Sequence, residues 1–385
     1  MLSRGFTFCV ADSSLFICRH SFGTIFLLLY VDDIIITGSN PSFLHSFIVE
    51  LSQEFAMKDL GTIHYFPGIS AQTFSGGLIL NQTKYAMDLL ERAQMLGCKP
   101  VSTPMVTKIR TISEDDEPYS DPEFYRSIVG GLQYLTITRP DLAFSVNYVC
   151  QFMHRPKVLH FKMVKRILRY VQGTLQLGFR LFNSCSLQLK AFSDTDWAGC
   201  PTTRRSTTGF CTFLGQNCIS WTAKKQPTVA RSSTEAEYRA LASAAAEVTW
   251  LTYLLQDIGL FVSSPPILLS DNISALQLTT NPVFHARTKH NELDYHFVRE
   301  KVIVGSLVTQ FVASSSQIAD IFTKALLSKL HAKFCSKLGL SIDTRPNLRE
   351  GVEDTQIKSQ TTKDLVLDSR RNSRQSAIVN QSQIS

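Results

Sequence analysis

Residues 25–38 read Ile-Phe-Leu-Leu-Leu-Tyr-Val-Asp-Asp-Ile-Ile-Ile-Thr-Gly and place two adjacent carboxylates, Asp32 and Asp33, between two apolar runs. Apolar runs of this length around a turn signal are typical of the two buried strands of a β-hairpin. Burying an unpaired carboxylate is costly, and the oxygen ligands of adjacent acids suit Mg²⁺. Aspartate also favours turns, so the pair could instead form the exposed tip of the hairpin. The residues alone leave both interpretations open, a metal site and a surface turn.

Length and composition narrow the class of protein. The chain has 385 residues, which is room for two or three domains, and its formal net charge of +7 favours a polyanionic partner. Its nine cysteines include no Cys-x-x-Cys pair, which argues for a reducing compartment and against a disulfide framework or a zinc site. The first residues do not resemble a signal peptide, and no apolar run reaches the roughly 20 residues that span a bilayer. We therefore expect an intracellular protein, cytoplasmic or nuclear, without a membrane partner.

Four segments differ in their residue patterns. Residues 1–105 alternate short strands and helices, and residues 106–186 are mainly helical. Residues 187–340 begin with three strands and continue with alternating helix and strand, which predicts an α/β fold with a mixed sheet and helices packed on it. Residues 341–385 are polar, lack periodicity and are predicted to form a disordered tail.

A basic stripe lies on the helix predicted for residues 159–171. Four basic side chains recur at the i, i+3, i+4 and i+7 positions of one face: Lys162, Lys165, Arg166 and Arg169. Such a stripe could bind the phosphates of a nucleic acid, and a merely solvated helix face explains it equally well. Two basic pairs are further candidates for the same contact: Arg204-Arg205 and Lys224-Lys225.

Two aspartates stand at the ends of predicted strands. Asp194 follows the strand predicted for residues 187–193, and Asp271 follows the short strand predicted for residues 267–269. Chemistry in sheet folds concentrates beyond strand ends. If these two strands are adjacent and parallel, the two carboxylates face each other across one strand spacing of about 5 Å. Two like charges at that separation need a cation between them.

The helix that follows the first three strands offers two further acids. Glu237 begins an apolar stripe that continues through Leu241, Ala244, Val248, Leu251 and Leu255. Glu235 lies about 200° away around the helix, where it fits a capping box with Ser232 and an i,i+4 pair with Arg239. We therefore predict that Glu237, and not Glu235, faces the strand ends.

Two more aspartates are candidates. Asp320 stands near the start of a helix predicted from residue 318, where a lone aspartate more often complements the helix dipole. Asp196 alternates with Asp194 on the same side of an extended chain and is an outside candidate.

Several blocks of the sequence resemble copia-type retrotransposon Pol polyproteins. Residues 26–38 resemble the metal-binding hairpin in the palm of their reverse transcriptases. Blocks that resemble their ribonuclease H domain are residues 193–209, 220–238, 270–272 and 287–290. Further blocks of the same family are Asp59-Leu-Gly61, residues 125–134 and Thr138-Arg-Pro-Asp-Leu-Ala143.

This resemblance implies a domain order and a site. Residues 1–105 would be a truncated α+β reverse-transcriptase palm, 106–186 a mainly helical thumb or connection, and 187–340 a ribonuclease H-like five-stranded mixed sheet with helices. The implied catalytic acids are Asp194, Glu237, Asp271 and Asp320. They would hold two Mg²⁺ ions about 4 Å apart, one to activate water and one to stabilise the leaving 3′ oxygen. The implied substrate is the RNA strand of an RNA–DNA hybrid, and other Pol segments are implied partners.

The chain departs from the family pattern at two places. Reverse transcription uses a third palm carboxylate and a fingers subdomain before the hairpin, and Asp12 is the only acid before Asp32. We therefore expect the polymerase remnant, Asp32 and Asp33, to be inactive alone. Cellular ribonucleases H also carry a histidine before the last aspartate, and residues 312–319 contain none, which implies slower product release.

Three upstream histidines are the other candidates for a metal site. His285, His290 and His296 fall at spacings that do not match the i,i+4 histidine pair of a metal-binding helix, so we interpret them as structural.

The sequence leads to three hypotheses. The first is a reverse transcriptase–ribonuclease H fragment whose self-contained enzyme is a Mg-dependent ribonuclease H-type endonuclease. The second is a non-catalytic relic that binds nucleic acid through its basic residues. The third is one part of a larger polyprotein with fingers supplied elsewhere. The four acids favour the first, because carboxylates that repel one another without a metal have no use in a relic.

Overall fold

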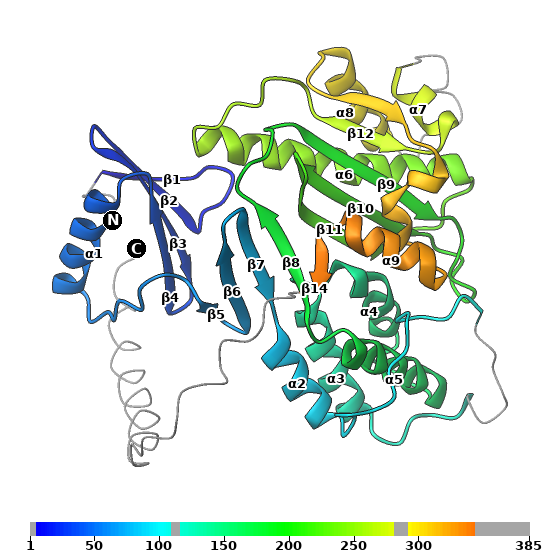
Figure 1. Cartoon of the computed structure of the whole chain (residues 1–385). Coiled ribbons are helices and arrows are strands. Elements are labelled where there is room, and N and C mark those ends of the chain that lie inside the picture. The colour runs from blue at the N-terminus through cyan, green and yellow to red at the C-terminus, as the bar shows by residue number, and fades with distance from the viewer. Residues whose placement is uncertain (1–4, 109–115, 281–291, 343–385) are drawn as a thin grey trace, which may run out of the picture. The chain divides into compact units, whose positions relative to one another are not determined.

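The computed structural model describes residues 5–108, 116–280 and 292–342 (Figure 1). Its strands are β1 (Phe6–Phe8), β2 (Leu15–His20), β3 (Gly23–Tyr30), β4 (Asp33–Gly38), β5 (Tyr65–Phe66), β6 (Ile69–Phe74), β7 (Gly77–Asn81), β8 (Leu177–Phe182), β9 (Leu189–Asp196), β10 (Thr207–Leu214), β11 (Asn217–Lys225), β12 (Ile267–Ser270), β13 (Val308–Phe311) and β14 (Leu340–Ile342). Its α-helices are α1 (Pro41–Glu54), α2 (Thr83–Arg92), α3 (Pro122–Leu135), α4 (Ala143–Cys150), α5 (Val158–Gly173), α6 (Ser233–Asp257), α7 (Ile273–Thr280), α8 (Glu292–Ile303) and α9 (Ser328–Lys337). Short 3₁₀ helices include η3 (Pro140–Leu142) and η7 (Ile318–Phe322).

The hairpin predicted from residues 25–38 is present in a four-stranded antiparallel sheet of order β1-β2-β3-β4. Alternate residues of β3 face a core, and Ile25 and Leu27 are fully buried there against Phe47 and Leu51 of α1. This alternation is what a sheet with one covered face requires. The strands therefore form as predicted, and the helix that follows them covers their apolar face.

The sheet that carries the predicted acids has five strands in the order β11-β10-β9-β12-β13. The pairs β9–β10 and β10–β11 are antiparallel, and β9–β12 and β12–β13 are parallel, so the sheet is mixed. Helix α6 packs on one face, where Leu189 and Ala191 of β9 meet Leu241 and Ala244 of the helix. The other face packs on η7 and α9 through Phe213, Phe322 and Phe334. Figure 1 shows α6 running along these strands.

Two elements of this region differ from their predicted form. Strand β9 continues to Asp196, so Asp194 lies inside the strand, because it still pairs with Gly209 of β10. The α-helix predicted from residue 318 is the 3₁₀ helix η7, and α9 begins only at Ser328. All five residues of η7 are buried, and Gln317 ties its start to the sheet by donating from Nε2 to the Ser193 carbonyl at 2.9 Å.

A third sheet has the order β14-β8-β7-β6-β5 and is antiparallel throughout. Its paired strands come from different segments predicted from the sequence, whose limits were residues 105, 186 and 340. Strands distant in the chain thus share one sheet, which residue patterns along the chain do not reveal. Ser341 and Ile342, predicted to begin the disordered tail, are instead part of β14, and the rest of that tail lies outside the described residues.

Helices α2 to α5 share a core of their own. It includes Leu89 of α2, Leu132 of α3, Val146 of α4 and Ile167 of α5, all nearly or fully buried. Within the described ranges, no helix is both long enough and apolar enough to cross a bilayer.

Candidate metal centre

Three of the predicted acids meet at one end of the five-stranded sheet. Asp194 comes from β9, Glu237 from the first turns of α6, and Asp271 directly follows β12. One carboxylate oxygen of each lies within 4.8 Å of the others. The parallel pairing of β9 and β12 explains the meeting, because Phe192 pairs with Leu269 and each aspartate comes two residues after one of these partners.

The centre is acidic, and two of its three acids are buried. Asp194 is 3% exposed and Glu237 is 7% exposed. Burial, and then the charges of Asp194 and Asp271, raise the pKa of Glu237 to about 9. Glu237 Oε2 is buried and has no hydrogen-bond partner among the described residues. Three carboxylates with an unsatisfied buried oxygen fit a hard divalent cation such as Mg²⁺.

Asp320 lies beside this group but not within the set of mutually close ligand atoms. Its Oδ1 forms an ion pair with Lys324 Nζ at 2.9 Å. Burial and the charge of Asp194 raise the pKa of Asp320 to about 6. The structure therefore brings together three of the four predicted acids and joins the fourth to them through a lysine.

Lys324 and Thr323 contact the centre, and neither residue was predicted from the sequence as part of it. Lys324 Nζ lies 3.4 Å from Asp194 Oδ2, and Thr323 Oγ1 donates a hydrogen bond to the same oxygen. Burial lowers the pKa of Lys324, but the carboxylates of Asp194 and Asp320 outweigh burial and hold it above its usual range. The i,i+4 spacing of Asp320 and Lys324 was the available signal. Nothing in the pattern of residues pointed to Asp194 as the second partner.

Asp196, the outside candidate, is half-buried and is not one of the three close acids. Burial raises its pKa, and its side chain lies against Gly199. A Cβ added at residue 199 would come within 1.5 Å of Asp196 Oδ2, so the glycine makes room for this carboxylate.

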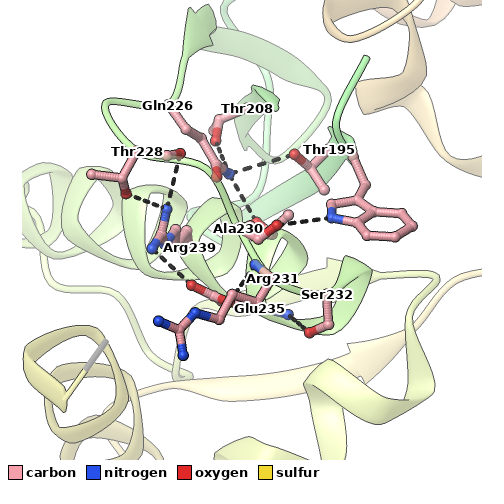
Figure 2. Close-up of polar contacts among 11 residues, drawn as sticks. Thr195, Thr208, Gln226, Thr228, Ala230, Arg231, Ser232, Glu235 and Arg239 are labelled. Carbon is pink, nitrogen blue, oxygen red and sulfur yellow. Dashed lines mark hydrogen bonds and ion pairs between the residues drawn. The ribbon is translucent and has the colours of Figure 1, made fainter. Parts of the chain in front are cut away.

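Glu235 lies outside the carboxylate group, in the hydrogen-bond network at the start of α6 (Figure 2). Its Oε1 pairs with Arg239 Nη2 at 2.8 Å, and its Oε2 accepts from the Arg231 amide at 2.7 Å. Its own amide donates to Ser232 Oγ at 3.1 Å, the N-cap bond of the helix. The carboxylate thus accepts from residue 231 where a capping box would use residue 232.

Gln226 holds this end of α6 against the sheet (Figure 2). Its Nε2 donates to the Ala236 carbonyl at 3.0 Å and to Thr208 Oγ1 at 3.1 Å, and it is 4% exposed. Ala236 immediately precedes Glu237, so this amide links strand β10 to the backbone that positions the glutamate. The sequence offered no signal for this role.

The basic residues proposed for nucleic-acid contact divide into two kinds. Arg166 Nη2 donates to Thr103 Oγ1 at 2.9 Å, and Arg169 Nε donates to the Lys99 carbonyl at 2.7 Å. These two arginines therefore hold residues 99–103 against α5. Lys162 and Lys165 are exposed on the same helix, and Lys165 Nζ lies 5.1 Å from the ring centroid of Phe161.

Of the two basic pairs, Arg204-Arg205 is also divided. Arg205 Nη1 donates to the Pro227 carbonyl at 3.1 Å, whereas Arg204 is exposed with a φ of 53°.

Asp32 and Asp33 are exposed at the turn between β3 and β4. Val31 in that turn has a φ of 54°, a left-handed conformation that is uncommon for a β-branched residue. Such strain is enriched at functional sites. The position of the pair fits a surface turn, and the strained backbone beside it marks the turn as unusual.

Three histidines were predicted to be structural. His285 and His290 lie outside the described residues, and His296 is in α8.

The chain is similar to known proteins over most of its length. Residues 2–107 match the reverse transcriptase (RNA-dependent DNA polymerase) family. The retrovirus-related Pol polyprotein from transposon RE1 of Arabidopsis thaliana is 44% identical over 341 residues, which cover 89% of this chain and 23% of that protein. An uncharacterized mitochondrial protein of the same plant is 58% identical over 226 residues, 59% of this chain and 94% of that protein.

Among solved structures, LC11-RNase H1, isolated from compost by a metagenomic approach, is 15% identical with a TM-score of 0.28. The match covers 36% of this chain and 93% of that one. The present chain spans about a quarter of the length of the RE1 polyprotein, 23%.

Proposed function

This chain belongs to the family of copia-type retrotransposon Pol polyproteins, and from that membership we propose that its carboxylate centre is the metal site of a ribonuclease H. The proposed reaction is hydrolysis of the RNA strand of an RNA–DNA hybrid. The proposed domains are a palm segment in residues 1–105, a connection in 106–186 and the ribonuclease H domain in 187–340.

The observation that carries this proposal is the meeting of Asp194, Glu237 and Asp271 within 4.8 Å. Three carboxylates that close repel one another unless a cation lies among them. They come from a strand, a helix and a strand end, so the fold itself brings them together. A structural role would call for a basic partner for each, and Glu237 Oε2 has none among the described residues.

Divalent ions bound here would supply an activated water and stabilise the leaving 3′ oxygen. Asp194 is the carboxylate common to the whole centre, since it belongs to the close group and also contacts Lys324, the partner of Asp320. Thr323 orients Asp194 through its hydroxyl. Gln226 fixes the first turns of α6 and so the direction of Glu237. These residues hold the ligands in place before the substrate arrives.

Substrate contact is proposed for the exposed basic side chains. Lys162, Lys165 and Arg204 are open to solvent and could bind phosphates of the hybrid. Arg166, Arg169 and Arg205 make the intramolecular contacts described above and would hold in place the elements that carry these exposed side chains. Asp32 and Asp33 are the proposed remnant of a polymerase site.

Cleavage of labelled RNA by the purified chain tests the proposal. We expect RNA in an RNA–DNA hybrid to be cut in Mg²⁺ and to stay intact in EDTA, and the same RNA to stay intact when single-stranded. Absence of hybrid cleavage at any Mg²⁺ or Mn²⁺ concentration would contradict the proposed function. Equal cleavage of single-stranded RNA would contradict the proposed substrate.

A further inference from the structure

Lys324 Nζ lies between two carboxylates of the centre. It is 2.9 Å from Asp320 Oδ1 and 3.4 Å from Asp194 Oδ2. A Mg²⁺ ion sits about 2.1 Å from each oxygen it binds, so an ion shared by these two oxygens on the side of the lysine would lie in the space that the ammonium group fills. Both cations cannot be there together.

The group of three acids is arranged differently from this pair. Asp194, Glu237 and Asp271 approach one another without a cation between them, and no ion pair between Lys324 and Glu237 or Asp271 is seen among the described residues. A first ion can therefore enter this group while Lys324 keeps its contacts. A second ion, held by Asp194 and Asp320, meets the lysine.

Lys324 is also able to leave. Its side chain is 45% exposed, whereas those of Asp194 and Asp320 are 4% and 11% exposed. The carboxylates are held by the sheet and by η7, and the lysine reaches them on a flexible stem of four methylenes. Displacement therefore moves the lysine and leaves the acids in place.

We propose that Lys324 occupies the position of the second metal ion in the metal-free protein and competes with that ion, so that the two ions bind in a fixed order. This inference rests on the proposed function, since it assigns the two ions to the same centre. The first ion binds to Asp194, Glu237 and Asp271. The second binds to Asp194 and Asp320 only when Lys324 swings away.

Mn²⁺ binding to the full chain tests the order without using activity. Free Mn²⁺ is followed by its electron paramagnetic resonance signal for the wild type, for Lys324→Met and for Lys329→Met. The Lys329 variant removes the same charge from an exposed residue five positions away. We expect Lys324→Met to bind the second equivalent of Mn²⁺ roughly five- to tenfold more tightly, because the ion no longer has to displace a lysine from two partly exposed ion pairs. The first equivalent should change less, and Lys329→Met should change neither.

A second readout keeps the inference testable if Lys324→Met is less stable. We expect saturating Mg²⁺ to raise the melting temperature more for Lys324→Met and Lys324→Gln than for the wild type, because tighter binding to the folded state stabilises it more. Equal or weaker binding of the second equivalent in both variants would overturn the inference. If the wild type cleaves hybrids and the binding order is unaffected, only this inference fails. If the wild type cleaves nothing, the proposed function fails and the Mn²⁺ result still decides the role of Lys324.

Discussion

At the scale of single residues, Asp271 allows one charge of the candidate metal centre to be removed with little change of shape. Asp271→Asn keeps an oxygen that can accept the hydrogen bond from Ser314 Oγ, now 2.7 Å from Asp271 Oδ2. It removes one of the three charges that are proposed to hold cations, and losing such electrostatic stabilisation costs at least about 100-fold in rate. We expect hybrid cleavage to fall by that factor or more, measured as the initial rate in Mg²⁺.

The same substitution separates a catalytic from a structural aspartate. Mutual repulsion falls when one carboxylate becomes neutral, so the metal-free variant should melt at the same temperature as the wild type or higher. Glu235→Gln is the matched control, since Glu235 pairs with Arg239 outside the group and should leave cleavage unchanged. A lower melting temperature in Asp271→Asn together with lost cleavage would indicate a structural role instead.

At the scale of elements, the start of α5 carries a buried histidine. His160 Nδ1 accepts a hydrogen bond from the Lys157 amide at 3.0 Å, and the imidazole stacks on Phe152 with 3.6 Å between ring centroids. Burial, and then the charge of Lys157, lower the pKa of His160 from 6.5 to about 4. The neutral imidazole is therefore the form that completes the helix start.

This pKa predicts a pH dependence of folding. Between pH 6.5 and about 4 the unfolded chain binds a proton at His160 that the folded chain does not. The stability that this residue contributes is present above pH 6.5 and is lost as the pH falls toward 4. We expect His160→Asn, which can still accept the amide hydrogen bond, to lose less unfolding free energy than the wild type between pH 7.5 and pH 5. Urea unfolding at the two pH values measures this, and equal losses would contradict the assignment.

At the scale of the whole molecule, a buried ion pair connects distant parts of the chain. Arg139 donates to both oxygens of Asp141 at 2.9 and 2.7 Å, and Tyr170 of α5 donates to Asp141 Oδ2 at 2.7 Å. The ring of His331 in α9 meets Tyr170 edge-on, with 5.4 Å between centroids. Residues from η3, α5 and α9 thus share one polar cluster, which gives the block Thr138-Arg-Pro-Asp-Leu-Ala143 a structural role.

Breaking this pair should be costly, because the side chains of Arg139 and Asp141 are 6% and 0% exposed. Removing one partner leaves the other charge buried and uncompensated, which costs about 3–5 kcal/mol. We expect Asp141→Asn to lower the free energy of unfolding by that amount, measured by urea denaturation. The double variant Arg139→Met with Asp141→Leu should recover part of the loss, because it leaves no unpaired charge. A loss below about 1 kcal/mol, the range of exposed pairs, would show that the cluster does not connect these elements.

The periodicity of the sequence was sufficient to predict where the acids on helices and strands lie. Glu237 lies on the apolar face of α6 and Glu235 off it, because side chains of a helix repeat every 3.6 residues wherever the helix packs. The meeting of Asp194 and Asp271 followed from two strands expected to pair in parallel, as β9 and β12 do, although β9 continues past Asp194 to Asp196. The family itself was recognisable from short blocks of residues, and the relatives confirm it.

Contacts between elements distant in the chain were decided only by the tertiary structure. Asp320 lies in a 3₁₀ helix and not in the predicted α-helix. Its partner Lys324 contacts Asp194, and the neighbouring Thr323 contacts the same aspartate across a separation of 129 residues. Arg166 and Arg169 share a helical face with Lys162 and Lys165, yet they bind residues 99–103. The third sheet joins residues 65–81, 177–182 and 340–342. Local spacing determines which face of an element a residue occupies, but the packing of the whole chain determines what that face meets.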